Sequence, residues 1–144
     1  MQNFRFRLAR VFEWYTRQYQ EEERIFSACL ATLADARQAI VDLQAERLSI
    51  ERDVLSRHSI PSRELVALGL YRLGARQREL ELIAVRERCE QAVEAQRVKL
   101  QAAERRVRLL EKLRDRRLTE HNYAEARELE ELASDAYFAK WAAR

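Results

Sequence analysis

The sequence contains very few residues that form turns. Among its 144 residues there are only two Gly and one Pro. Sandwiches, barrels and doubly wound sheets need a turn roughly every ten residues, built largely from Gly, Pro, Asn and Asp. Glycine-rich loops that bind phosphate are excluded for the same reason. The chain is therefore predicted to be all-α, with few and very long helices.

Long hydrophobic runs are also missing. The longest purely aliphatic run near the middle covers only residues 82–85, whereas a membrane-spanning helix needs about 18–20 apolar residues. Residues 1–10 alternate Phe with Arg and lack the apolar stretch of a signal peptide. We therefore expect a cytoplasmic protein.

Cysteine and histidine are too scarce for a disulfide scaffold or a metal site. The only cysteines are Cys29 and Cys89, and the only histidines are His58 and His121. We expect the two cysteines to fill small core positions as free thiols, with a disulfide between them as the alternative. The helical layout predicted below puts His58 at a turn and His121 near the far end of a long helix, too far apart in space to act as a pair.

One cluster of helix breakers, residues 56–62, interrupts the helical pattern. Pro61 disfavours helix in the residue before it, and Ser59 or Ser62 can cap the helix that follows. We predict a first helix over about 3–57, a turn at 58–61 and a second helix over about 62–140. Together they are predicted to form a long two-helix antiparallel coiled-coil hairpin with unequal arms, as a single domain over 1–144.

The first predicted helix carries a heptad pattern. Its two apolar series are interrupted only by Glu22 and Arg47 across seven heptads, which is typical of a coiled coil. If the chain folds back at the turn, facing residues have numbers that sum to about 118 or 119. In that register Cys29 faces Cys89, and Glu22 faces Gln96. We interpret Glu22 and Gln96 as a polar layer that fixes the register.

The second predicted helix is longer than the first. About 30 residues after Leu113 should have no partner within the chain, although they carry an apolar face. A long amphipathic helix is unstable with such a face in water, so we expect it to dock on another molecule. The residues of this face are Leu118, Leu129, Leu132, Ala133, Ala136, Tyr137 and Trp141.

Charge is distributed unevenly, although the net charge is only +3. The hairpin register places Arg5, Arg7 and Arg10 beside a basic stretch over residues 105–117, which includes Arg114, Arg116 and Arg117. The stretch that follows is acidic. A solvated surface, an acidic protein partner and nucleic acid are the three interpretations of the basic end, the last being the weakest because the basic face does not run unbroken.

An enzyme needs convergent polar groups in a pocket, and a two-helix hairpin has no interior large enough to hold one. We therefore expect no enzymatic activity, no catalytic or metal-binding residues, no cofactor and no small-molecule substrate.

In several motifs the sequence resembles the FliJ family of flagellar type III export proteins. The aromatic-basic start at residues 4–11 is similar to the start of that family. Its middle segment is similar to residues 61–65 and 71–73 of this chain. Its most recognisable stretch resembles residues 110–117, and its acidic closing motif resembles residues 128–133. The order and spacing of these motifs carry the resemblance, which covers nearly the whole chain.

The resemblance implies a non-catalytic stalk that binds the hexameric export ATPase and the cytoplasmic domain of the export gate, with export chaperones as further partners. Such a stalk would be a monomeric hairpin, peripherally associated with the inner membrane at the export apparatus. Under this hypothesis the ATPase contact is formed by Arg5, Arg7, Arg10, Arg114, Arg116, Arg117, Leu129, Leu132 and Trp141.

Three alternatives stay open. Trp14-Tyr15 and the aromatic tail at residues 137–141 depart from the flagellar pattern, which leaves the YscO/SctO-like stalk proteins of injectisomes as close relatives. A coiled coil that self-associates through the unpartnered residues after Leu113 is the second alternative. An Arg-rich coiled coil that binds nucleic acid is the third, and its binding would weaken steeply with salt.

Overall fold

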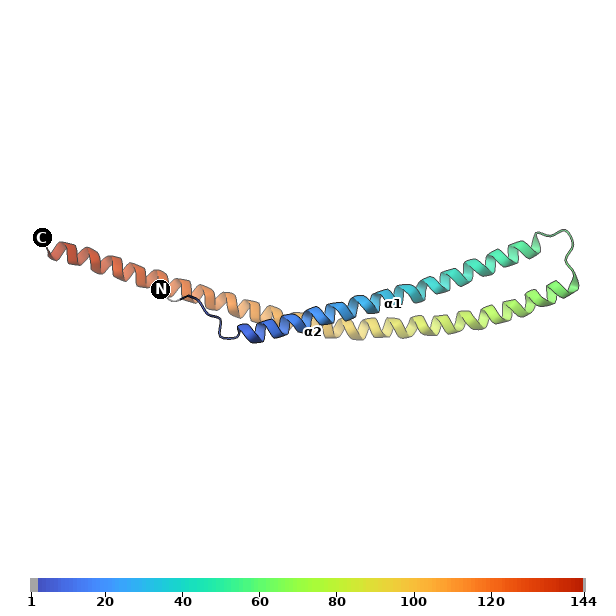
Figure 1. Cartoon of the computed structure of the whole chain (residues 1–144), viewed down its shortest axis with the longest axis horizontal. Helices are drawn as coiled ribbons and strands as arrows, with labels where there is room; N and C mark the ends of the chain where they lie inside the picture. Colours follow the sequence, from blue (N-terminus) through green and yellow to red (C-terminus); the bar gives the residue numbers. More distant parts are fainter. Residues whose placement is uncertain (1–2, 144) are drawn as a thin grey trace. The chain divides into compact units, whose positions relative to one another are not determined.

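The computed structural model describes residues 3–143 and shows two helices packed against each other in an antiparallel hairpin (Figure 1). Helix α1 covers Ala9–Leu55 and helix α2 covers Ser62–Ala142, so the arms have 47 and 81 residues. The described residues contain no strand. The predicted all-α hairpin with unequal arms is therefore confirmed. The single domain predicted over 1–144 also includes Met1, Gln2 and Arg144, which lie outside the described residues.

The turn occupies residues 56–61, where the helix breakers of the sequence gather. Ser56 ends α1 by donating its hydroxyl to the carbonyl of Asp53 at 3.0 Å. Pro61 precedes α2, and its carbonyl accepts the backbone N–H of Glu64 at 2.9 Å. Arg57 joins the two sides of the turn through Glu64 at 2.8 Å. The predicted start of α2 agrees with the structure, whereas α1 ends two residues earlier than predicted.

The start of the first helix was predicted wrongly. The prediction began at residue 3, but α1 begins at Ala9 and residues 3–6 have no regular secondary structure. Phe4 and Phe6 alternate with exposed Arg5 and Arg7. Such a two-residue period suits an extended backbone, in which successive side chains point to opposite sides, and not a helix.

The hairpin contains two compact units, residues 22–100 (unit 2) and residues 1–21 with 101–144 (unit 1). In unit 2 a single seam of apolar side chains runs between α1 and α2. In unit 1 the corresponding buried residues are Ala103 and Val107. The buried apolar residues of unit 2 are Leu33, Ala36 and Ile40 on α1, and Leu68, Ala75 and Val93 on α2.

Ion pairs between the helices flank the seam of unit 2. Arg37 contacts Glu90 at 3.2 Å, and Arg72 contacts Glu51 at 2.9 Å. Partly exposed pairs of this kind contribute about 0–1 kcal/mol each, so the seam supplies most of the stability and the pairs help to set the register. In the predicted register, where facing residue numbers sum to about 118, Arg78 lies opposite the buried Ile40. Its side chain is 63% exposed and pairs with Glu81, so its charge is not buried.

Neither helix within residues 3–143 combines the length and the hydropathy that a membrane-spanning segment requires.

Candidate partner-binding site

The predicted polar layer lies at the end of unit 2. Gln96 is buried, with 7% of its surface exposed, and its amide Nε2 donates to the carboxylate of Glu22. The same nitrogen lies 3.4 Å from the backbone carbonyl of Glu22. Both contacts join α1 to α2 in the register that the heptads predicted. Because a slip of either helix would bury Gln96 against apolar groups, this pair favours one register.

Cys29 and Cys89 are half-buried free thiols. Both line a cavity of about 300 Å³ in unit 2, together with Ala28, Thr32 and Ala92. In the structure the two cysteines therefore act as small side chains beside the seam, and no disulfide joins them.

Arg47, the second polar position in the heptads of α1, avoids the seam by pairing with charged neighbours. It lies 3.6 Å from Glu79 and 3.9 Å from Glu51. Tyr71 occupies the opposite position on α2, and its hydroxyl is buried without a hydrogen-bond partner among the described residues. Burial raises the pKa of the Tyr71 phenol above 10.0, and the nearby carboxylate of Glu46 acts in the same direction. The phenol is therefore neutral at physiological pH.

The basic end of unit 1 is built on aromatic side chains of α1. The guanidinium of Arg114 lies 5.3 Å from the centre of the Phe12 ring, and that of Arg106 lies 5.9 Å from the centre of the Tyr15 ring. Stacking over a ring holds an arginine in place while its remaining N–H groups stay available to a partner. Arg10 and Arg116 are exposed nearby in sequence, on α1 and α2 respectively.

The N-terminal segment lies against α2 in unit 1. The ring of Phe4 meets the imidazole of His121 edge-to-face, with 5.6 Å between the ring centres. A cleft of about 790 Å³ opens between the two chain segments, and its lining includes Arg5, Arg7 and Arg117. The structure thus brings three of the predicted binding arginines to one cleft.

The same contact corrects the predicted start of the unpartnered stretch. Sequence analysis placed it directly after Leu113, but Phe4 contacts α2 as far along as His121. Residues 3–6 are not helical, so each of them can advance farther along α2 than the roughly 1.5 Å per residue of a helix. The alternation of Phe and Arg in residues 4–7 was the sequence signal for this contact, and it was not used. His121, which contacts Phe4 and lines the cleft, was not included among the predicted binding residues as a result.

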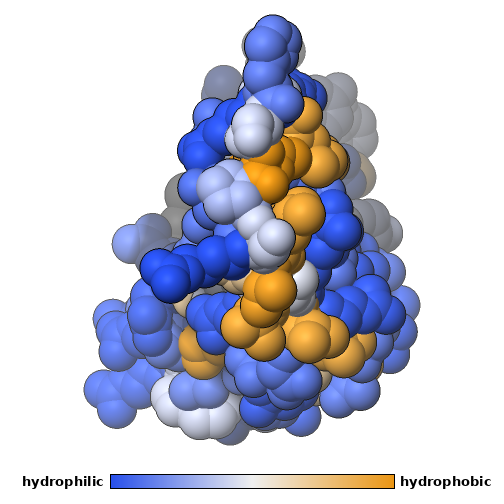
Figure 2. All heavy atoms as spheres, turned by 90° about the vertical axis from the view of Figure 1, so that its right-hand side faces the viewer, coloured by the Kyte–Doolittle hydropathy of each residue, from blue (hydrophilic) through white to orange (hydrophobic). Residues whose placement is uncertain are grey.

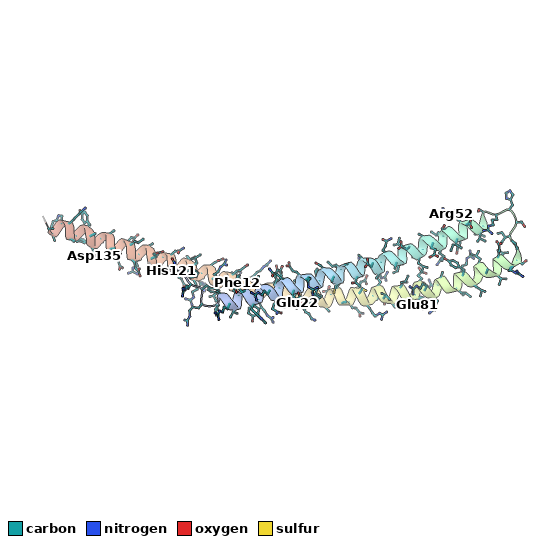
Figure 3. All side chains as sticks on the ribbon, in the orientation of Figure 1. Phe12, Glu22, Arg52, Glu81, His121 and Asp135 are labelled. Carbon is teal, nitrogen blue, oxygen red and sulfur yellow. The ribbon has the colours of Figure 1, made fainter. Side chains whose placement is uncertain are left out.

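Beyond His121, helix α2 continues with no second helix beside it within the described residues, as Asp135 illustrates (Figure 3). The predicted binding residues Leu129, Leu132 and Trp141 are 47%, 65% and 74% exposed. Tyr137 and Phe138 are also exposed and contact each other edge-to-face. We call residues 122–143 the C-terminal stretch. The structure does not place its predicted residues in contact with the predicted arginines.

The C-terminal stretch is acidic as well as apolar. Glu125, Glu128, Glu130, Glu131 and Asp135 lie on it, against the basic residues Arg127 and Lys140. A partner for this surface would therefore combine an apolar face with basic flanks.

No group of His, Cys, Asp and Glu among residues 3–143 is arranged to hold a metal ion. No protein-family model, curated protein or solved structure matches the chain.

Proposed function

We propose that the chain is a non-catalytic stalk of a flagellar type III export apparatus, which binds the hexameric export ATPase and the export gate. The counterpart in an injectisome is the alternative within the same class. The ordered motifs of the sequence support this proposal, as does the architecture of two antiparallel helices with one arm much longer than the other. In this function the protein would sit at the membrane through its partners, and export chaperones would be further partners.

The C-terminal stretch is the observation that carries the proposal. Leu132, Tyr137 and Trp141 are each at least 65% exposed. Exposed aromatic and aliphatic residues that recur along one helix mark a protein-binding surface. A helix that lays such a face into a partner's groove binds through residues spaced three or four apart, as Leu129, Leu132 and Ala136 are. The arginines of the cleft would add electrostatic attraction to acidic groups on the ATPase.

Binding of the purified export ATPase from the same organism tests the proposal. Trp141→Ala and Leu132→Glu should each weaken binding about ten-fold or more, because central apolar anchors contribute about 2 kcal/mol or more to such interfaces. Val98→Glu is the matched control, since Val98 is a 61% exposed residue of α2 in unit 2. Equal binding by the control and both C-terminal variants would contradict the role of the C-terminal stretch. Absence of binding by the unmodified chain would contradict the proposed function.

A further inference from the structure

Near the turn, α2 is apolar on the face that points away from α1. Leu68 and Ala75 are buried in the seam, whereas Val66, Leu70 and Leu73 are 64%, 66% and 70% exposed. These exposed residues follow the three- and four-residue spacing of one helix face. Leu80 extends the same face by two turns and is 48% exposed. We call these four residues the back stripe. Seen end-on, the turn end of the molecule presents apolar surface bordered by hydrophilic side chains (Figure 2).

Two glycines lie beside the back stripe without a structural reason inside the chain. A Cβ atom built on Gly69 or Gly74 would meet nothing within 4 Å. Neither residue has a positive φ. Each glycine costs about 1 kcal/mol relative to Ala in a helix interior. Small residues at such positions allow another backbone or a large side chain to approach closely, which points to an occupant from outside the chain.

We propose that the back stripe binds the same stripe of a second copy of this chain, antiparallel, about a two-fold axis near residue 72. In this arrangement Leu70 of one copy fills the space beside Gly74 of the other, and the reverse contact forms by symmetry. Leu73 lies next to the axis. The proposal replaces the monomeric hairpin expected from the sequence, and it does not depend on the proposed function, because that function rests on unit 1.

Charge supports a second copy over another partner. Arg63 and Glu81 lie 18 positions apart on α2, which is five helical turns, so both lie on the same side of the stripe. The midpoint between Arg63 and Glu81 is residue 72, and so is the midpoint between Leu70 and Gly74. A single two-fold axis near residue 72 therefore relates the two residues of both pairs. Residues on the same side of antiparallel helices face each other, so Arg63 of each copy would meet Glu81 of the other.

Neither charge of this pair is committed elsewhere in a way that prevents the contact. Arg63 has no ion pair among the described residues. Glu81, labelled on α2 in Figure 3, is 53% exposed, and its contacts are long ones on its own helix, to Arg78 at 3.4 Å and Gln77 at 3.5 Å. The stripe covers 15 residues, or about 22 Å of helix. An interface of this size lies at the small end of the specific range, so we expect a dissociation constant of about 1–100 µM.

Sedimentation of the full chain at concentrations across that range tests the proposal. We expect a monomer–dimer equilibrium that Leu70→Glu shifts at least ten-fold towards monomer. Leu132→Glu, an exposed leucine of the C-terminal stretch, is the matched control and should leave the equilibrium unchanged. Circular dichroism would verify that the variants keep their helical content. A monomer at every concentration, or a dimer that depends on Leu132 and not on Leu70, would overturn the proposal.

Charge reversal tests the antiparallel arrangement itself. Arg63→Glu and Glu81→Arg should each weaken self-association about three- to ten-fold, because like charges then face each other twice. The two variants mixed in equal amounts should form a heterodimer, since each reversed charge meets its opposite in the other chain. The double variant should also regain self-association. Failure of both the mixture and the double variant to recover dimer would overturn the antiparallel arrangement.

Discussion

At the scale of single residues, the pair formed by Glu22 and Gln96 shows how one polar layer can define a coiled coil. In a purely apolar seam, one helix can shift by seven residues along the other, because apolar side chains still face apolar side chains after the shift. Gln96 is 7% exposed and donates to Glu22. Any other register would leave its amide buried without an acceptor, at a cost of about 1–3 kcal/mol.

Glu22→Ala should therefore lower the free energy of unfolding by about 1–3 kcal/mol, because Gln96 stays buried without its partner. Replacing both residues by Leu should be neutral or stabilising, while relaxing the register. Urea unfolding followed by circular dichroism measures both effects, and Glu23→Ala, an exposed neighbour, is the control. If Glu22→Ala proved as harmless as Glu23→Ala, the polar layer would have no role in stability.

At the scale of the helices, α2 runs without interruption past Gly69 and Gly74. No neighbouring atom within the chain requires a glycine at either position. Gly69→Ala adds a Cβ that meets no atom within 4 Å, so the helix gains propensity without a clash. We expect the free energy of unfolding to rise by about 0.5–1 kcal/mol. The reverse change, Ala67→Gly at an exposed position of the same helix, should lower it by a similar amount.

The measurement is urea unfolding at low protein concentration, where self-association does not contribute. A loss of stability in Gly69→Ala would contradict the open surroundings of that residue.

The helices also show how far the sequence alone determines the fold. The scarcity of Gly and Pro and the heptads of α1 were enough to predict the hairpin, its turn and the polar layer. These two signals gave a wrong prediction at residues 3–8. The helical pattern that follows was extended into these residues, although Phe and Arg alternate there. The exposure of the two glycines of α2 could not be predicted before the face of the helix turned towards α1 was known.

The candidate site was predictable only in part. Arg5, Arg7 and Arg117 line one cleft, and the alternation of Phe and Arg at residues 4–7 indicated a non-helical segment there, but not which part of α2 that segment contacts. The contact between Phe4 and His121 depends on residues 3–6 not being helical, because a non-helical segment carries Phe4 farther along α2 than a helical start would. Local composition does not encode that displacement.

At the scale of the whole molecule, separate surfaces are proposed to bind separate partners. The C-terminal stretch and the arginines of the cleft belong to unit 1, and the back stripe belongs to unit 2. Variants of one surface are therefore expected to leave the other partner unaffected. The proposed ATPase contact and the proposed self-association can be disproved independently.

Hydrogen exchange of residues 122–143 shows whether the C-terminal stretch is uncovered in the free chain and covered by the ATPase. In the free chain these backbone amides should exchange much faster than those of the seam at residues 26–40, because the C-terminal stretch has no second helix to cover it. Addition of the export ATPase should slow their exchange, while the amides of unit 2 stay unchanged. Strong protection in the free chain, or no added protection when the ATPase is bound, would contradict the account.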